Sequence, residues 1–152
     1  MFTILAKMTM DATGSAARFR VPQGIAVHGA DLYVSDTDNF TIRMVVIATP
    51  EVTTLAGSAE TPGGTDGTGS LARFFSPRGI ATDGINIYVA DVDIIRSIVI
   101  ATGAVTTLAG EERGSMDGTG AAARFNQARG IAADCTYVYV AGTENNAIRL
   151  IR

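Results

Sequence analysis

The chain has one cysteine, one histidine and no apolar run long enough to cross a membrane. A single cysteine, Cys135, excludes a disulfide within the chain and leaves the cellular compartment open. His28 is the only histidine, and no CxxC or HxxxH spacing occurs, so the sequence predicts no metal site with nitrogen and sulfur ligands. No G-x-S-x-G or comparable nucleophile motif is present, and we therefore assign no catalytic residue.

The net charge of the chain is also small, at −3. This value gives no overall attraction to nucleic acid or to an anionic membrane surface. Met1–Met10 does not have the pattern of a signal peptide, because its only cation, Lys7, lies inside the apolar stretch. The apolar fraction of 47% exceeds what a small monomer needs, and it favours a chain that buries large faces against a partner.

What the chain does have is a block that occurs three times. The block begins at Asp11 as DATGSAARF, at Asp66 as DGTGSLARF and at Asp117 as DGTGAAARF. Each copy leads into QGIAV or RGIA, then into a YVSD, YVAD or YVAG run, and then into an IR run. The first two copies continue into VTTLAG. A period near 50 residues indicates structural units that are stacked or arranged around an axis.

Each repeat contains four short runs rich in Ile, Val, Thr and Tyr, bounded by Gly, Asp and Pro. Such runs predict antiparallel strands in an all-β protein, and four strands form one blade of a β-propeller. The second and third runs are apolar at consecutive positions, which indicates that both sheet faces are covered by neighbouring blades. The first run is built from small residues around Gly24, Gly79 and Gly130, as the crowded inner strand of a blade requires.

The consensus A-R-F-x-x-P-x-G-I-A-x-D-G-x-x-Y-V-A-D-x-x-N-x-x-I-R-x-I-x-x-A-T-G-x-V-T-T-L-A-G resembles the NHL-repeat family of β-propellers over essentially the whole chain. The resemblance implies a propeller, commonly six-bladed. It also implies a role in binding protein or RNA, and related propellers include a few metal-dependent enzymes.

The phase of the repeats suggests how a ring closes. We expect a single domain over residues 1–152, with an outer strand in 1–10, blades in 11–57 and 66–110, and a third blade in 117–152 that lacks its outer strand. Phe2–Ala6 aligns with Val52–Ala56, so it is an outer strand without its own blade. Three blades are too few for a ring of roughly 4–8. We therefore expect a homodimer with six blades, in which each N-terminal strand completes the partner's third blade. The alternatives are a piece of a longer propeller or a different partner chain.

Most charged residues recur in register, which favours structural roles. Asp11, Asp66 and Asp117 share one repeat position, and recurrence indicates turn capping. Two further positions hold arginine in every repeat, which predicts buried or inter-blade ion pairs; they are Arg18, Arg73 and Arg124, and Arg43, Arg96 and Arg149. The DGTG block resembles a phosphate loop but is expected to precede no helix, so it is interpreted as the outer-to-inner connection with Gly at positive φ. His28, in a predicted turn, is expected to be solvated.

One candidate binding site remains, at the end of the blades where the inner strands begin. The inner strands are preceded by Gln23, Arg78 and Arg129, near the mouth of the channel. The loops between the second and third strands lie on the same face and carry Asp36, Asp38, Asn39, Asp91, Asp93, Glu144, Asn145 and Asn146. We expect this face to bind a partner peptide or a small anion, unless it is simply a solvated polar rim.

The sequence thus favours a non-enzymatic interaction scaffold without a cofactor. The first alternative is a cation-dependent propeller hydrolase or lyase resembling gluconolactonases. That alternative needs carboxylates around a central cation, whereas most acids here recur in register. The second alternative is an RNA-binding NHL module, which the acidic balance disfavours.

Overall fold

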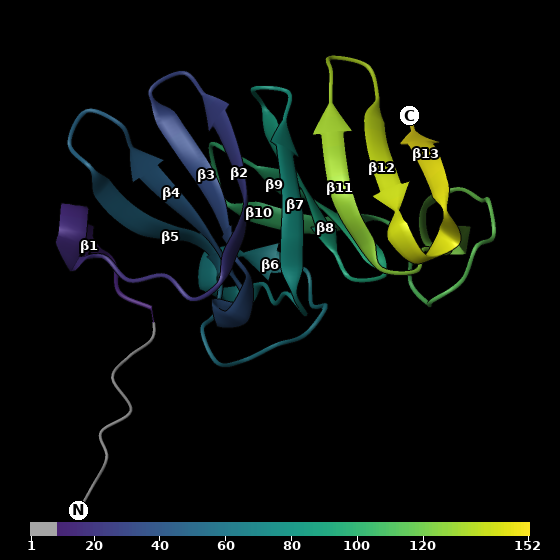
Figure 1. Ribbon diagram of the computed structural model, residues 1–152, viewed down its shortest axis with the longest axis horizontal. Helices are drawn as coiled ribbons and strands as arrows, with labels where there is room; N and C mark the ends of the chain where they lie inside the picture. The colour runs from purple at the N-terminus through teal and green to yellow at the C-terminus, as the bar shows by residue number, and fades with distance from the viewer. Residues whose placement is uncertain (1–8) are drawn as a thin grey trace, which may run out of the picture.

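In the computed structural model, which describes residues 9–152, the chain forms three antiparallel β-sheets that follow one another in sequence (Figure 1). The predicted all-β architecture is confirmed, and the three sheets have the arrangement of propeller blades. They contain five, five and three strands. The segment Phe2–Ala6, predicted to be an outer strand, lies outside the described residues.

The first blade is a meander whose strands run outward from the centre of the molecule. Its strands are β2 (Pro22–His28), β3 (Asp31–Asp36), β4 (Thr41–Val46) and β5 (Glu51–Gly57). A two-residue strand, β1 (Ala12–Thr13), pairs with the outer edge of β5. The first blade therefore has one strand more than the four that were predicted. The extra strand belongs to the repeated block, which lies along the outermost edge before the chain crosses to the centre.

The second blade repeats this arrangement, and the third lacks an outer strand. The second contains β7 (Pro77–Thr82), β8 (Asn86–Asp91), β9 (Ile94–Val99), β10 (Ala104–Ala109) and the two-residue β6 (Gly67–Thr68). The third contains β11 (Ala128–Ala133), β12 (Val138–Gly142) and β13 (Ala147–Ile151). Within the described residues no strand pairs with the outer edge of β13.

A single 3-10 turn lies within each repeated block, and in the described part of the chain no longer helix follows it. The turns are η1 (Gly14–Ala16), η3 (Gly69–Leu71) and η4 (Gly120–Ala122). The first glycine of each turn has a φ between 53° and 56°, so the predicted use of glycine at positive φ is confirmed. Two further 3-10 turns, η2 (Thr37–Asn39) and η5 (Thr143–Asn145), join the second and third strands of blades one and three.

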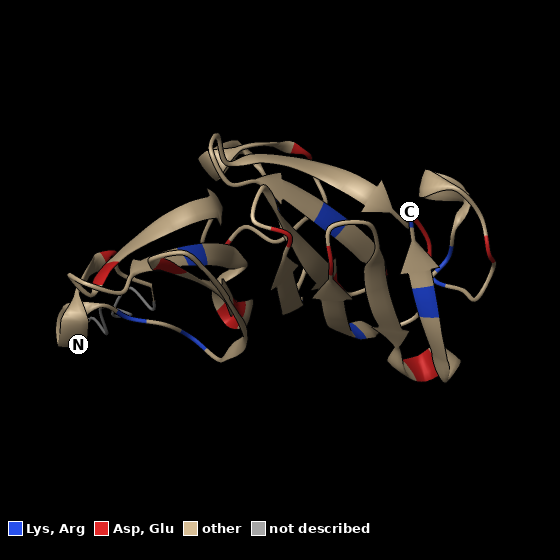
Figure 2. Ribbon diagram, turned by 90° about the horizontal axis from the view of Figure 1, so that it is seen from above, with Lys and Arg blue, Asp and Glu red and all other residues tan. Residues whose placement is uncertain are grey.

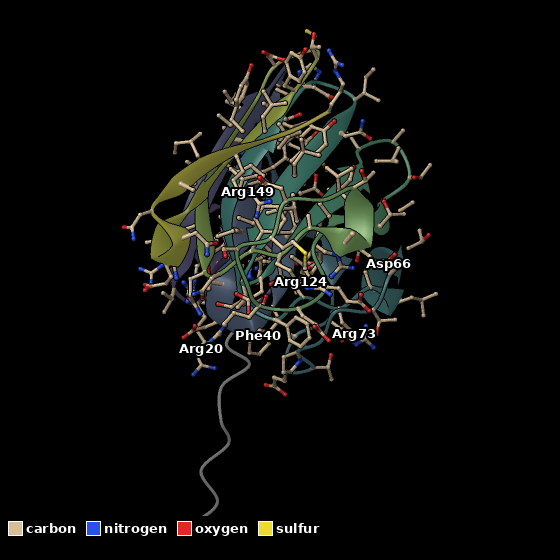
Figure 3. All side chains as sticks on the ribbon, turned by 90° about the vertical axis from the view of Figure 1, so that its right-hand side faces the viewer. Arg20, Phe40, Asp66, Arg73, Arg124 and Arg149 are labelled. Carbon is tan, nitrogen blue, oxygen red and sulfur yellow. The ribbon has the colours of Figure 1, made fainter. Side chains whose placement is uncertain are left out.

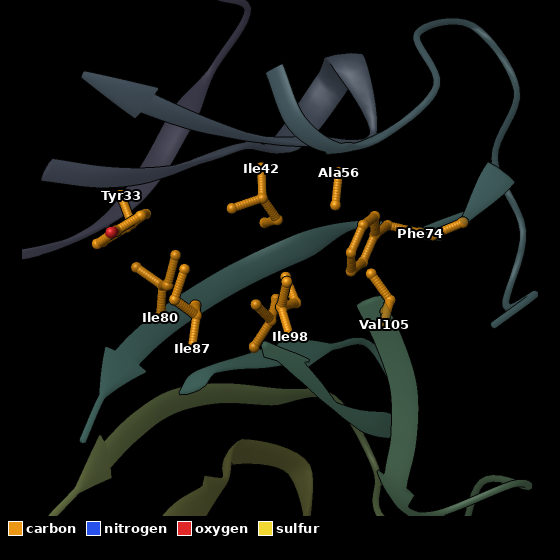
Figure 4. Close-up of a cluster of buried hydrophobic side chains, with 10 residues drawn as sticks. Tyr33, Ile42, Ala56, Phe74, Ile80, Ile87, Ile98 and Val105 are labelled. Carbon is orange, nitrogen blue, oxygen red and sulfur yellow. The ribbon is translucent and has the colours of Figure 1, made fainter. Parts of the chain in front are cut away.

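The hydrophobic core lies between the blades rather than within them. One cluster joins the first and second blades through Tyr33, Ile42 and Ala56 on one side and residues including Phe74 and Ile80 on the other (Figure 4). A second cluster joins the second and third blades, so both faces of the second blade are covered. The consecutive apolar residues of its strands are explained by these two contacts.

The recurring arginines hold each repeated block against its own blade. The guanidinium groups of Arg43, Arg96 and Arg149 lie 4.9, 5.2 and 4.7 Å from the ring centres of Phe19, Phe74 and Phe125. Each also pairs with the aspartate that opens the block, at 2.7, 2.9 and 2.6 Å for Asp11, Asp66 and Asp117. The predicted pairing is therefore present for this set of arginines, within a repeat and not between blades. At the other recurring position, Arg18 and Arg73 instead donate to the backbone carbonyls of Ser15 and Ser70. The charged positions of both signs are interspersed along the strands and loops (Figure 2), and Figure 3 shows Arg149 and Arg124 at the end formed by the last blade.

Candidate binding site at the channel mouth

Each inner strand begins with a β-bulge. In β2 the pairing with β3 passes from Pro22 to Gly24 and skips Gln23. In β11 it passes from Ala128 to Gly130 and skips Arg129, and the corresponding irregularity in β7 includes Arg78. A bulge bends the strand and changes the direction of the extra side chain, and all three candidate residues lie at such a bulge.

Close contact between the inner strands places these three positions in a row. Gly24 lies directly against the carbonyl oxygen of Arg78, and Gly79 lies directly against that of Arg129. A Cβ at either glycine would overlap the neighbouring backbone, so only glycine allows this approach. Gln23, Arg78 and Arg129 thereby lie on adjacent inner strands.

Arg78 is partly buried in this row and is only partly bonded. Its Nη1 donates to Oε1 of Gln127 at 3.0 Å, while its Nε is buried with no hydrogen-bond partner within residues 9–152. Arg129 and Gln23 are exposed. The row therefore offers guanidinium and amide donors at the start of the inner strands.

Two of the candidate carboxylates are buried and serve the fold. Asp36 accepts from the backbone nitrogen of Arg20 at 2.6 Å and from Nη1 of Arg43 at 3.0 Å. Its other partner is the candidate amide Asn39, whose Nδ2 donates at 2.7 Å. These bonds fix the segment that enters the inner strand, and they leave Asp36 and Asn39 turned into the protein.

Asp91 has the same position in the second blade. It accepts from the backbone nitrogens of Phe75 and Ser76 at 3.0 and 2.6 Å, and Arg96 lies 3.7 Å away. Burial raises the pKa of Asp91 to about 6, although these two N–H donors and the charges of Arg96 and Arg78 act to lower it. The positive charge of Arg78 thus favours the ionised form of this buried carboxyl group.

The remaining candidates lie in the loops that join the second and third strands of each blade. Asp38 pairs with Arg20 at 3.7 Å, and both side chains are about half exposed, at 47%. Asp93 accepts from the backbone nitrogen of Gln127 at 2.9 Å and from Nε of Arg113 at 3.1 Å. Asn145 accepts from the nitrogen of Asn126 and donates to the carbonyl of Gly114, at 3.0 and 3.1 Å. Glu144 and Asn146 are exposed.

Gln127 belongs to the site although sequence reasoning did not include it. Its side chain holds Arg78, and its backbone nitrogen binds Asp93 in the preceding blade. Val21 and Ser76 occupy the same repeat position, at which the consensus has no fixed residue, so the sequence carried no signal for Gln127.

Two further properties of the described chain concern metals and membranes. Within residues 9–152, no group of three or more His, Cys, Asp or Glu side chains is placed to hold a metal ion. In the same part of the chain, no helix has the length and hydropathy needed to cross a membrane.

Comparison with known proteins gives structural but not sequence-family matches. No family model matches the sequence, and no curated protein matches it. An auxiliary nutrient binding protein from Bacteroides thetaiotaomicron has a TM-score of 0.77 and 25% identity, over 84% of this chain and 36% of its own. A protein of unknown function from the same organism has a TM-score of 0.72 and 28% identity, over 79% of this chain and 32% of its own.

The chain therefore spans about a third of the length of these solved structures. They are β-rich and propeller-like, and they support the fold seen here. A third structure from that organism, named as a phosphatase on a provisional basis, has a TM-score of 0.74 at 22% identity and shows the fold alone. The chain is thus similar in fold to propeller-like proteins that carry different names, one of them a nutrient-binding protein.

Proposed function

We propose that the chain is a propeller of NHL type that acts as a non-enzymatic scaffold for binding a protein or small-molecule ligand. The repeated sequence blocks and the blade-like sheets support this proposal. The auxiliary nutrient binding protein that is 25% identical supports a binding role, although this chain spans only 36% of that protein.

In the same proposal, two chains form one six-bladed ring. Each chain contributes three blades, and Phe2–Ala6 of one chain completes the third blade of the other. The outer edge of β13 supports this assignment, because no strand within residues 9–152 pairs with it, whereas β5 and β10 occupy the corresponding edges in the first two blades. An unpaired strand edge is a site where another strand adds by backbone hydrogen bonds.

The bound group in this proposal is a carboxylate, of a peptide or of a small molecule, at the channel mouth. One observation carries it: three successive β-bulges bring Gln23, Arg78 and Arg129 into a row. Guanidinium groups bind carboxylates through paired hydrogen bonds of favourable geometry. The neighbouring carboxylates of Asp36 and Asp91 are bonded inside the protein and do not occupy these donors.

The test is binding of a fluorescein-labelled tetraglutamate peptide, measured by anisotropy. The double variant Arg78→Ala/Arg129→Ala is expected to weaken binding at least tenfold, because two charge-assisted contacts are lost. The control Arg18→Ala/Arg152→Ala removes the same charge elsewhere, since Arg18 bonds its own turn and Arg152 contacts Tyr137. Equal affinity of the double variant and the wild type would refute the site.

A further inference from the structure

The contact between the first and second blades and the contact between the second and third blades, here called seams, are built in the same way. The first and third blades each have an open face that carries the residues of one half of such a seam. At the first seam Gly24 receives the carbonyl of Arg78, and at the second Gly79 receives that of Arg129. Gly130 has the same repeat position in the last blade. A Cβ placed there would meet only the Cβ of Ala141 of its own blade, at 3.2 Å. Among residues 9–152, no carbonyl group lies against Gly130 as one does against Gly24 and Gly79.

The apolar residues of the last blade repeat this pattern. Ile42 and Ile95 occupy one repeat position, and both are fully buried in their seams, with 0% of their surface exposed. Ile148 occupies that position in the third blade and is 77% exposed. Leu150, two residues further along β13, is 55% exposed. The outer face of the last blade thus presents the apolar side chains of a seam to solvent.

The first blade presents the complementary half. Ile80 and Ile131 project into the two internal seams, where Ile80 is 7% exposed and Ile131 packs against the second core cluster. Ile25 is their counterpart in the first blade and is 64% exposed, and Val27 beside it is 61% exposed. An open apolar hollow lined by Phe19, Pro22, Gln23, Gly24, Ile25 and Val34 lies on this face.

A hydrogen bond crosses the first seam, and the residues that correspond to its donor and its acceptor lie on the two open faces. Thr37 donates its hydroxyl to the carbonyl of Pro77 across that seam, at 2.7 Å. Thr143 aligns with Thr37, and Pro22 aligns with Pro77. Thr143 is exposed on the last blade and Pro22 is exposed on the first. The residues of one seam are therefore divided between the two ends of a single chain. The last blade carries the threonine donor, the glycine and one isoleucine, and the first blade carries the proline acceptor and the other isoleucine.

From this division we propose that the open face of the first blade docks on the open face of the third blade of a second copy of this chain. The inference rests on the two-chain ring proposed above and assigns the residues that form it. The second copy is the occupant because this chain itself carries both halves of the seam. A head-to-tail contact of this kind closes when two copies make it reciprocally. The two arginine rows then face one shared channel.

The experiment measures solution mass by light scattering during size-exclusion chromatography, without any ligand. The wild type is expected at twice the chain mass of 15.8 kDa. Ile25→Asp and Ile148→Asp are each expected at the mass of one chain, because an unpaired carboxylate would be buried in the seam. Both residues are exposed in a single chain, so these variants should keep their folds, which circular dichroism checks.

The control is Ile85→Asp, the same change at a residue that is 70% exposed in the turn between β7 and β8, on the second blade and therefore outside both open faces. It should remain a dimer. A wild-type mass other than twice the chain mass would overturn the proposal, as would a dimer that survives either seam variant. Tetraglutamate binding by the same samples separates the two proposals, because loss of dimer with binding retained leaves the arginine site intact.

Discussion

Arg78 takes part in three contacts of different kinds at one point of the molecule. Its carbonyl oxygen lies against Gly24 of the preceding blade, and Ser35 donates its hydroxyl to the same oxygen. Its Nη1 binds Gln127 of the following blade, and its charge acts on Asp91 below. A residue that joins three blades by backbone and side chain is held in a fixed orientation, which is what recognition of an anion requires.

Asp91 provides a measurable consequence of this arrangement. Its folded pKa of about 6 lies above its ordinary value of 3.8, so the folded chain retains this proton over that interval while the unfolded chain releases it. The contribution of Asp91 to the free energy of unfolding therefore falls as pH rises from 3.8 to 6, and stays constant above 6. We expect Arg78→Ala to raise the pKa of Asp91 further, because it removes one of the two charges that lower it.

Carboxyl-detected NMR of protein labelled with ¹³C aspartate measures this pKa directly. The control is Arg129→Ala, since Arg129 does not contribute to the pKa of Asp91. An unchanged or lower pKa in Arg78→Ala would contradict the assigned interaction.

At the scale of the element, each repeated block is fastened to its blade by one arginine. Arg96 shows the full set: it lies over Phe74, binds Asp66, and donates to the carbonyl of Arg73 at 2.7 Å. The side chain is completely buried, so these partners replace the water that a guanidinium normally binds. The short strand β6 and the turn η3 are thereby held at the outer edge of the second blade.

Asp66→Ala is therefore expected to lower the free energy of unfolding by about 1–3 kcal/mol, because a buried guanidinium loses a charged partner. Thr107 also loses the acceptor for its hydroxyl, which lies 2.9 Å from the same carboxylate. Asp117→Ala is expected to have a smaller effect, because Asp117 is 97% exposed and Arg149 retains some contact with solvent at 12%. Urea unfolding of both variants checks the order, and equal losses would show that burial of the arginine is not the deciding factor.

The longer strands of the blades could be predicted because they depend on local composition and on the period of the repeat. The two-residue strands β1 and β6 could not, since Ala-Thr and Gly-Thr carry no strand signal and pair only through their position against β5 and β10. The burial of Asp36 beside the half-exposed Asp38 depends on a distant backbone nitrogen, that of Arg20, which periodicity does not locate.

At the scale of the whole molecule, the three blades lie side by side (Figure 1), and exposed apolar residues occur on the outer face at each end of the row. One end presents Ile25 and the other presents Ile148, both of which have buried counterparts inside the row. Exposed apolar faces of this kind are interaction surfaces or aggregation hazards in a protein that stays monomeric. In the proposed ring both faces are covered, and the two arginine rows surround one axis.

The hydrogen bonds of the candidate carboxylates bear on the choice between a binding scaffold and a cation-dependent hydrolase or lyase. A cation at the mouth would need oxygen ligands with free lone pairs directed to one point. Asp36 instead accepts from a backbone nitrogen and from Arg43, and Asp91 accepts from two backbone nitrogens. Asp93 accepts from the backbone nitrogen of Gln127 and from Arg113. We therefore expect the melting temperature to be unchanged by Ca²⁺ or Mn²⁺ after dialysis against EDTA, because an ion that does not bind the native state does not stabilise it. A rise of several degrees with either ion, reversed by EDTA, would favour the enzyme and redirect attention from the arginines to the carboxylates.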